Sequence, residues 1–272
     1  MSRRLGFSTL GCSGATVAQI IRFAQDGRAP GVELRSAADE VVNVGLSAAA
    51  ATEIGGAFRD EGVEVLCVAS YVGLCSVDDV DDDLDRNLDL ARRLGAGGVR
   101  VFMKDEDAVA GDALTPGEER AIERLSRVAG SDIPVLIETH DSHSSARRLA
   151  RFLQAADATV TENPARVLWD TAHSWSHGET PAESLADLMP WLAHLQIKDE
   201  RSLADPVPVA LGDGSYPVAQ LAAALDAAHW SGWLALEWER KWHPTLPPLD
   251  AALVAAHDWA APLFTTEGQG TL

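Results

Sequence analysis

Ligand-type side chains directly follow four short apolar segments of this chain. They are Glu138 with His140, Asp170 with His173, Gln196 with Lys198, and Glu237 with Glu239. Carboxylate and amide oxygens bind hard divalent cations, and glutamate, histidine and lysine side chains also transfer protons. Carboxylates gathered in a protein interior are costly unless a positive charge compensates them. If the four segments meet at one place, the pattern therefore implies a bound cation with acid and base groups beside it.

Short apolar segments of this kind are typical of strands that are buried on both faces of a sheet. Ligands of α/β folds lie at the carboxyl ends of strands, and a closed (β/α)8 barrel brings four such ends to one point. The chain contains eight strand-helix units, and an α/β barrel takes about 250 residues. We therefore predict a single-domain α/β fold, a (β/α)8 TIM barrel over residues 1–264, followed by a polar tail at 265–272.

The boundaries of these units follow from hydrophobic periodicity and from residues that typically begin or end helices and strands. Strands are expected at 5–8, 31–35, 63–69, 99–103, 135–138, 167–170, 192–197 and 232–237. Helices are expected at 16–26, 48–61, 116–129, 145–154, 181–189, 218–228 and 249–260, and another begins in the acidic run 78–85. The segment 201–217 is expected to be a long loop that covers the active site.

Alternation along the strands predicts which side chains face the barrel interior. His194, Gln196 and Lys198 alternate with Leu195 and Ile197, and the apolar set must pack outward against helices. The same rule predicts that Glu138, His140, Glu237 and Glu239 point inward. It also puts Glu33 and Arg35 on one face of their strand, and Arg100 and Phe102 on one face of theirs. Asp199 is interpreted either as a partner of the site or as a cap of the following loop.

Composition narrows the class of protein and its surroundings. Hydrophobic residues make up 46% of the 272, and no apolar run approaches the roughly 20 residues that cross a bilayer. The segment 5–12 is too short and too polar for a signal-peptide core. Three cysteines without a CxxC pair suit a reducing compartment, where we expect them to be small core or loop residues. The net charge of −19 disfavours nucleic acid. A cytoplasmic protein with no nucleic-acid or membrane partner is expected.

Four motifs of this chain resemble the signature segments of the xylose isomerase-like TIM-barrel superfamily, and the similarity extends along the whole chain. The motifs are Glu138-Thr139-His140, Asp170-Thr171-Ala172-His173, Gln196-Ile197-Lys198-Asp199 and Leu236-Glu237-Trp238-Glu239. The resemblance implies that Glu138, Asp170, Gln196 and Glu237 are metal ligands and that Glu138 and Glu237 are acid and base. It also implies that His140 and His173 contact substrate or move protons, and that Lys198 polarises a substrate oxygen.

One ligand departs from the usual pattern, because most members have histidine where this chain has Gln196. The ligand set is then all oxygen, which favours Mn2+ or Mg2+ over Zn2+ or Co2+. Glu33, Arg100, Trp175 and Trp242 are predicted to bind substrate, the tryptophans by covering a sugar ring. His143, His177, His229 and His257 are expected at the surface.

Two enzymatic hypotheses follow, and both begin with proton removal beside a carbonyl group. The first is a metal-dependent isomerase or epimerase of a small polyhydroxylated ketone or aldehyde, and the second is a lyase that expels a β-substituent. A non-catalytic sugar-binding barrel is disfavoured because binding needs no acid-base pair. An abasic-site endonuclease is disfavoured by the acidic charge. No Arg/Lys cluster marks a phosphate pocket, so the substrate is expected to be unphosphorylated, and a homo-oligomer is compatible with the sequence.

Overall fold

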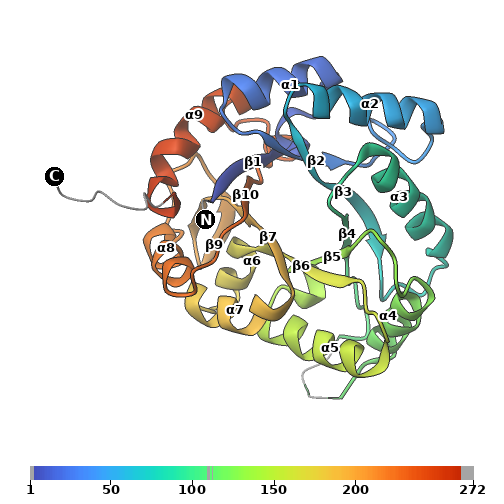
Figure 1. The fold of residues 1–272 in the computed structure, drawn as a ribbon. Coiled ribbons are helices and arrows are strands. Elements are labelled where there is room, and N and C mark those ends of the chain that lie inside the picture. The colour runs from blue at the N-terminus through green and yellow to red at the C-terminus, as the bar shows by residue number, and fades with distance from the viewer. Residues whose placement is uncertain (1–2, 109–110, 112, 265–272) are drawn as a thin grey trace.

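Eight parallel strands form a closed barrel with helices around its outside, as Figure 1 shows for the computed structural model. The structure describes residues 3–108, 111 and 113–264, so the predicted tail at 265–272 lies outside the described residues. The order around the ring is β1-β10-β7-β6-β5-β4-β3-β2. The strands are β1 (Arg4–Ser8), β2 (Gly31–Arg35), β3 (Glu64–Gly73), β4 (Val99–Phe102), β5 (Val135–Glu138), β6 (Ala165–Asp170), β7 (Leu192–Ile197) and β10 (Trp233–Leu236). The predicted single (β/α)8 TIM barrel is confirmed.

The helices lie between successive strands and begin at residues that the sequence marks. They are α1 (Val17–Asp26), α2 (Ala48–Asp60), α3 (Asp81–Leu94), α4 (Pro116–Arg127), α5 (Ala146–Thr159), α6 (Thr171–Ser176), α7 (Pro181–Leu188), α8 (Val218–Ala227) and α9 (Leu249–Trp259). Short 3-10 turns are η1 (Thr9–Cys12), η2 (Asp141–His143), η3 (Met189–Trp191) and η4 (Ala261–Leu263). Thr16, Thr115 and Thr180 form capping boxes at α1, α4 and α7. Each box satisfies backbone N–H groups that have no partner within the helix.

The apolar core is divided by the barrel wall. Outside the wall, Ile137, Leu195 and Leu236 belong to the large cluster between strands and helices, as alternation predicts. Inside it, a smaller apolar layer consists of Cys67, Ala69, Leu136 and Leu168. Burying one large aliphatic side chain stabilises the fold by roughly 1.5–3 kcal/mol. The interior layer therefore stabilises the barrel, and it fills the interior below the polar end.

A short helix and a hairpin were not predicted from the sequence. The helix α6 follows Asp170 immediately, and a hairpin of β8 (Glu200–Ser202) and β9 (Asp205–Pro208) occupies part of the predicted loop. Both are too short to show a periodic pattern in the sequence. Asp199 accepts hydrogen bonds from the backbone N–H groups of Gly212, Gly214 and Tyr216, so it caps this loop.

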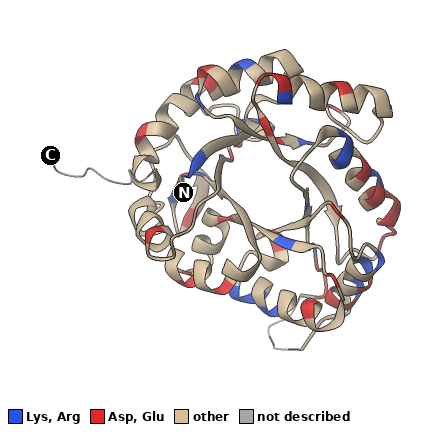
Figure 2. Cartoon of the chain, in the orientation of Figure 1, with Lys and Arg blue, Asp and Glu red and all other residues tan. Residues whose placement is uncertain are grey.

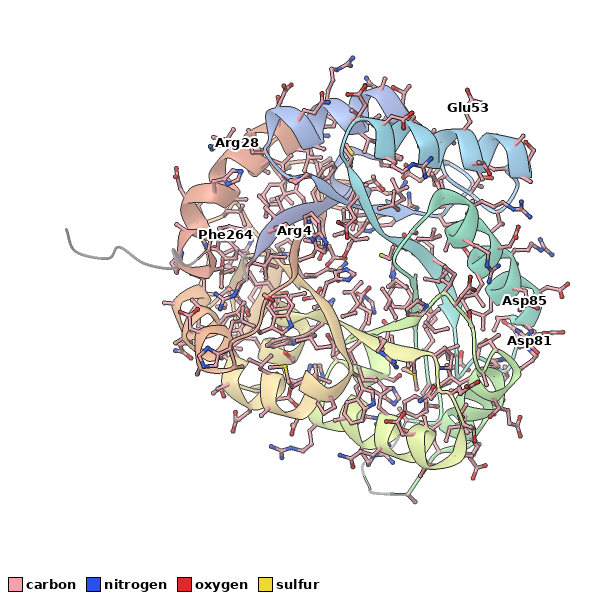
Figure 3. The ribbon with its side chains drawn as sticks, in the orientation of Figure 1. Arg4, Arg28, Glu53, Asp81, Asp85 and Phe264 are labelled. Atoms are coloured by element: carbon pink, nitrogen blue, oxygen red, sulfur yellow. The ribbon has the colours of Figure 1, made fainter. Side chains whose placement is uncertain are left out.

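Charged residues are scattered over the outer ring of helices, and acidic ones gather on α3 (Figure 2). Glu53, Asp81 and Asp85 project away from the barrel (Figure 3). Three aspartates lie in the first turn of α3, where they complement the helix dipole as predicted. The three cysteines are free, and Cys67 and Cys75 are buried. Among the described residues, no helix combines the length and apolar character that a membrane span needs.

Candidate active site

Four strands deliver charged side chains to the same end of the barrel, as the sequence predicts. Glu138 and Asp170 are the last residues of β5 and β6, Lys198 follows β7, and Glu237 follows β10. All four residues are at most 9% exposed. Gln196 lies on β7 beside Asp170 in the strand register. The four predicted metal ligands therefore come from neighbouring strands at one end of the barrel.

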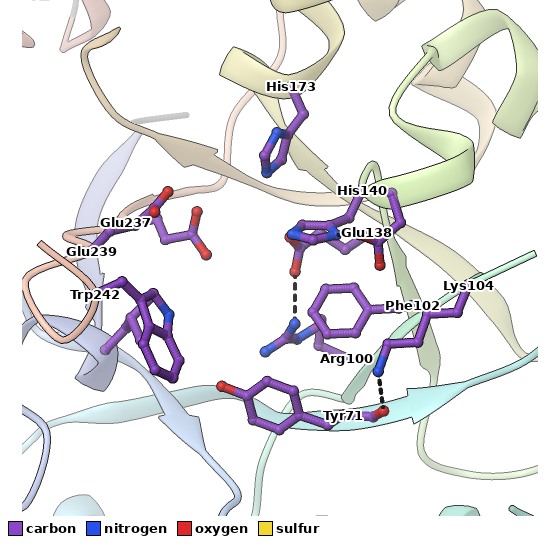
Figure 4. Close-up of a pocket in the computed structure, with 12 residues that line it drawn as sticks. Tyr71, Arg100, Phe102, Lys104, Glu138, His140, His173, Glu237, Glu239 and Trp242 are labelled. Carbon is purple, nitrogen blue, oxygen red and sulfur yellow. Dashed lines mark hydrogen bonds and ion pairs between the residues drawn. The ribbon is translucent and has the colours of Figure 1, made fainter. Parts of the chain in front are cut away.

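A cavity of about 350 Å3 opens at this end of the barrel, and Glu138 and Glu237 line it, whereas Asp170, Gln196 and Lys198 do not. Its lining residues are Leu10, Tyr71, Arg100, Phe102, Lys104, Glu138, His140, Asp141, His173, Glu237, Glu239 and Trp242. Figure 4 shows Glu237, Glu239 and Trp242 on one side and Arg100, Phe102 and Lys104 on the other. The volume lies at the lower end of the range for small-molecule sites, roughly 300–1,000 Å3. A small polar molecule matches this size and this lining.

Lys198 is a buried cation below the cavity. Its Nζ lies 2.8 Å from Asp170 Oδ2, 2.8 Å from Glu237 Oε2 and 2.7 Å from Glu239 Oε1. Burial would lower the pKa of Lys198, but the surrounding carboxylates outweigh it and raise that pKa well above its usual range. The lysine is therefore a permanent positive charge.

Glu138 and the two histidines have different electrostatic surroundings. Burial raises the pKa of Glu138 to about 8, although Arg100 Nη1 lies 3.1 Å from its Oε2 and opposes the rise. Burial would lower the pKa of His140, but contact with Asp141 outweighs it and raises that pKa. Burial and the nearby Lys198 hold the pKa of His173 well below its usual range. Neighbouring groups with pKa values pushed apart are typical of acid-base sites.

The buried oxygens of the predicted ligand set fit a divalent metal ion. Glu138 Oε1 and Gln196 Oε1 have no hydrogen-bond partner in the described part of the chain. Asp170, His173 and Glu237 each place a ligand atom within 4.8 Å of the others. Four carboxyl groups, including that of Glu239, face two cations, Arg100 and Lys198, so the site carries two excess negative charges when all four are ionised. Oxygen donors with that excess suit a hard divalent cation.

Several predicted residues lie elsewhere than expected. Glu33 is fully buried in the barrel interior, and Trp175 packs against Tyr216 with a ring distance of 5.7 Å. Neither residue lines the cavity, so direct substrate contact by them is not supported. Lys198 also lies below the lining, enclosed by carboxylates, whereas Arg100 and Trp242 do line the cavity.

The expectation that His143 is a surface residue is wrong. Its side chain is fully buried, and its Nε2 lies 3.0 Å from Glu118 Oε1. The cause is a polar network below the loops after β4 and β5, which turns the ring inward between α4 and α5. His177 and His229 are exposed, as expected, and His257 is half-buried with a bond to a backbone carbonyl.

Several lining residues received no role in the sequence interpretation. Tyr71 continues the inward face of β3 that Cys67 and Ala69 occupy, so the alternation rule could have placed it. Lys104 and Asp141 have positive φ values of 51° and 48°, which no sequence pattern signals for these residue types. Such backbone geometry costs about 1 kcal/mol or more and is common at functional sites.

Comparisons with known proteins agree with the barrel fold. Residues 22–263 match the family model described as xylose isomerase-like TIM barrel. A xylose isomerase domain protein from Planctomyces limnophilus superposes with a TM-score of 0.76 at 17% identity, over 97% of this chain and 98% of that one. D-psicose 3-epimerase from Clostridium cellulolyticum H10 gives 0.75 at 14%, over 96% and 100%. A probable 3-DHS dehydratase from Bacillus anthracis gives 0.70 at 17%, over 92% and 97%.

The structural likenesses, at these identities, establish the shared fold. No curated protein sequence gives a significant match to the chain. The reaction must therefore be argued from the cavity and its side chains.

Proposed function

Because the chain belongs to the xylose isomerase-like TIM barrel family, we propose that it is a divalent-metal-dependent isomerase or epimerase of a small keto-sugar or polyol-derived ketone. The observation that carries the proposal is the pair of glutamates, Glu138 and Glu237, which enter one cavity from different strands. Simple binding of a sugar needs no such pair. Proton removal on one face of a carbon and its return on the other does need two groups.

The metal would be held by Glu138, Asp170, Gln196 and Glu237, with Mn2+ or Mg2+ favoured by the all-oxygen set. When bound, such an ion polarises adjacent carbonyl and hydroxyl oxygens and makes the C–H between them more acidic. Glu138 or Glu237 removes that proton to give an enediolate, and the other returns a proton to the opposite face. Trp242, which is 55% exposed at the rim, covers the sugar ring.

The side chains around the two glutamates orient them. Arg100 holds one oxygen of Glu138, and Lys198 holds one oxygen of Glu237. The His140 ring lies between Phe102 and His173, with ring distances of 4.5 Å and 4.7 Å. His140 and His173 contact substrate hydroxyl groups and pass protons to them. Orientation of this kind favours reaction because the groups need not reorganise.

A lyase is the second candidate. His140 favours it, because elimination requires an acid that protonates the departing hydroxyl group, and His140 lines the cavity with a raised pKa. The likeness to a probable 3-DHS dehydratase is consistent with such chemistry. Elimination would create a conjugated enone with new ultraviolet absorbance, which epimerisation does not.

The test uses metal-stripped protein that is reconstituted in turn with Mn2+, Mg2+, Co2+ and Zn2+. Each form is incubated in deuterated water with D-allulose, D-tagatose and D-fructose, and the product is followed by NMR and ultraviolet absorbance. We expect Mn2+ or Mg2+ to support the highest rate, with deuterium placed on the carbon next to the carbonyl. Turnover without label would contradict the enediolate route, and highest activity with Zn2+ would contradict the metal assignment.

A further inference from the structure

Glu33 joins two side chains of β7 across the barrel interior. Its Oε1 lies 2.8 Å from His194 Nε2, and its Oε2 accepts a hydrogen bond of 2.8 Å from Gln196 Nε2. Glu33 belongs to β2, which β1 and β10 separate from β7 in the ring. Glu33 is fully buried, and His194 and Gln196 are at most 4% exposed. Both carboxylate oxygens of Glu33 are therefore engaged, and none of the three residues lines the cavity.

This contact determines the orientation of the Gln196 amide. A carboxylate accepts hydrogen bonds and cannot donate them, so the NH2 group of Gln196 must face Glu33. The oxygen then points the other way, where it is buried without a hydrogen-bond partner among the described residues. A flipped amide would bring two oxygens together at the Glu33 contact. The neighbour of Gln196 on β6 is Asp170, another predicted metal ligand.

We infer that Glu33 is a positioning residue for the metal site, because it holds the Gln196 amide with its oxygen toward the ion. This inference rests on the metal site of the proposed function. The terminal torsion of glutamine is broad and permits either orientation, so an unrestrained amide would also present its NH2 group. An NH2 group cannot bind a cation, and it would repel one. Histidine at this position needs no such choice between oxygen and nitrogen.

A different use of Glu33 has less support. Glu33, Cys67 and His194 place ligand atoms within 4.8 Å of one another and could hold a second metal ion. Both oxygens of Glu33 already have hydrogen-bonding partners, however, and these contacts account for the cluster without an ion. The burial of Glu33 also separates it from a substrate in the cavity.

The experiment measures Mn2+ binding to metal-stripped protein by electron paramagnetic resonance, without substrate. In Glu33→Gln the new amide can donate or accept, so Gln196 is free to flip. We expect this variant to bind Mn2+ at least about tenfold more weakly, in the range found for residues that orient metal ligands. His194→Gln keeps an NH2 donor for Glu33 and leaves the Gln196 contact intact. We expect its affinity to stay within about threefold of wild type.

A double-mutant cycle separates positioning from a general structural role. In a Gln196→Leu background the amide is gone, so adding Glu33→Gln should change Mn2+ affinity by less than about twofold. An equal loss in both backgrounds, or unchanged affinity in Glu33→Gln alone, would overturn the inference. Thermal unfolding of each metal-stripped variant checks that it folds. If Glu33→Gln does not fold, Glu33→Asp is used instead, because its shorter side chain also moves the carboxylate away from Gln196.

The outcomes also distinguish this inference from the proposed function. Wild-type protein that binds none of the four divalent ions would refute the metal site, and the inference with it. Wild-type binding with no difference between Glu33→Gln and His194→Gln would leave the metal site standing and remove the role of Glu33.

Discussion

Glu138 and Glu237 reach the same cavity with different partners. Glu138 meets the guanidinium of Arg100, whereas Glu237 shares the ammonium of Lys198 with Asp170 and Glu239. Arg100 makes one ion pair with Glu138, of 3.1 Å from its Nη1, whereas the Lys198 ammonium acts as a point charge among three carboxylates. The two glutamates therefore meet different cations, in keeping with the opposite roles in proton transfer that we propose for them.

Both glutamates should be essential for turnover. We expect Glu138→Gln and Glu237→Gln each to lower kcat by at least about a thousandfold, because each change removes an acid-base group and a ligand charge. Steady-state kinetics on the reconstituted enzymes measures this. Glu53→Gln, on the outer surface of α2, is the control and should keep wild-type activity. Near-normal turnover in either site variant would refute the mechanism.

At the residue scale, the sequence could predict the direction of side chains on strands but not their contacts. Alternation placed Glu138, Gln196 and Glu237 inward because the outward face of each strand must pack against helices. The contact of Glu33 with His194 and Gln196 depends on how eight strands close, which no local pattern contains. For the same reason the burial of His143 was missed.

At the scale of elements, a buried network joins the loops that carry His140 and Lys104 to α4 and α5. Glu118 is its centre: Oε1 contacts His143, Arg148 and Arg151, and Oε2 accepts from the backbone of Thr115. The carboxylate thus caps α4 and anchors the loop after β5. Helix boundaries were predictable from caps and prolines, whereas this link between elements was not.

This network makes stability depend on pH. Burial would raise the pKa of Glu118, but hydrogen bonds from His143 and Arg151 outweigh it and lower that pKa from 4.5 to about 2. Its contribution is therefore complete above pH 4.5 and is lost as the pH falls toward 2. We expect Glu118→Gln to lower the free energy of unfolding at pH 7 by about 2 kcal/mol or more.

The decline in stability between pH 4.5 and 2 should also be shallower in Glu118→Gln, which urea unfolding at several pH values would measure. Glu119→Gln, on the exposed face of the same helix, is the matched control and should follow wild type. An unchanged pH profile in Glu118→Gln would contradict the assignment.

Two adjacent glycines of α2 test how closely the helices pack. A Cβ on Gly55 would lie 2.5 Å from the carbonyl oxygen of Leu94 at the end of α3, whereas the nearest atom to one on Gly56 is Arg59 Nη2 at 3.7 Å. Alanine favours a helix over glycine by about 1 kcal/mol. Gly56→Ala should therefore stabilise the protein by up to that amount. Gly55→Ala should destabilise it by about 1–3 kcal/mol, because α3 must shift. Urea unfolding would measure both, and the same sign for both would refute this view of the packing.

At the scale of the whole molecule, the barrel closes where β1, from the start of the described chain, pairs with β10, from near its end. The eightfold count of strand-helix units predicted this closure. Sequence pattern could not show which side chains secure it, because they are more than two hundred residues apart. Arg3 is one of them: its Nη1 donates to the carbonyl of Leu263 at 2.8 Å and its Nε to that of Trp230 at 3.1 Å.

Arg3 should therefore contribute far more to stability than its neighbour Arg4. The Arg3 side chain is 5% exposed and also pairs with Asp226 at 2.6 Å, so Arg3→Ala removes this ion pair and the donor to two partly buried backbone carbonyls. We expect a loss of roughly 2–4 kcal/mol in the free energy of unfolding. Arg4 is 51% exposed, with a 3.4 Å ion pair to Glu64 and a stacking contact with Trp233. Arg4→Ala should cost about 1 kcal/mol or less, since exposed pairs are weak. Urea unfolding of both variants decides the matter, and equal losses would mean that the ends of the barrel are secured by backbone pairing and apolar packing rather than by Arg3.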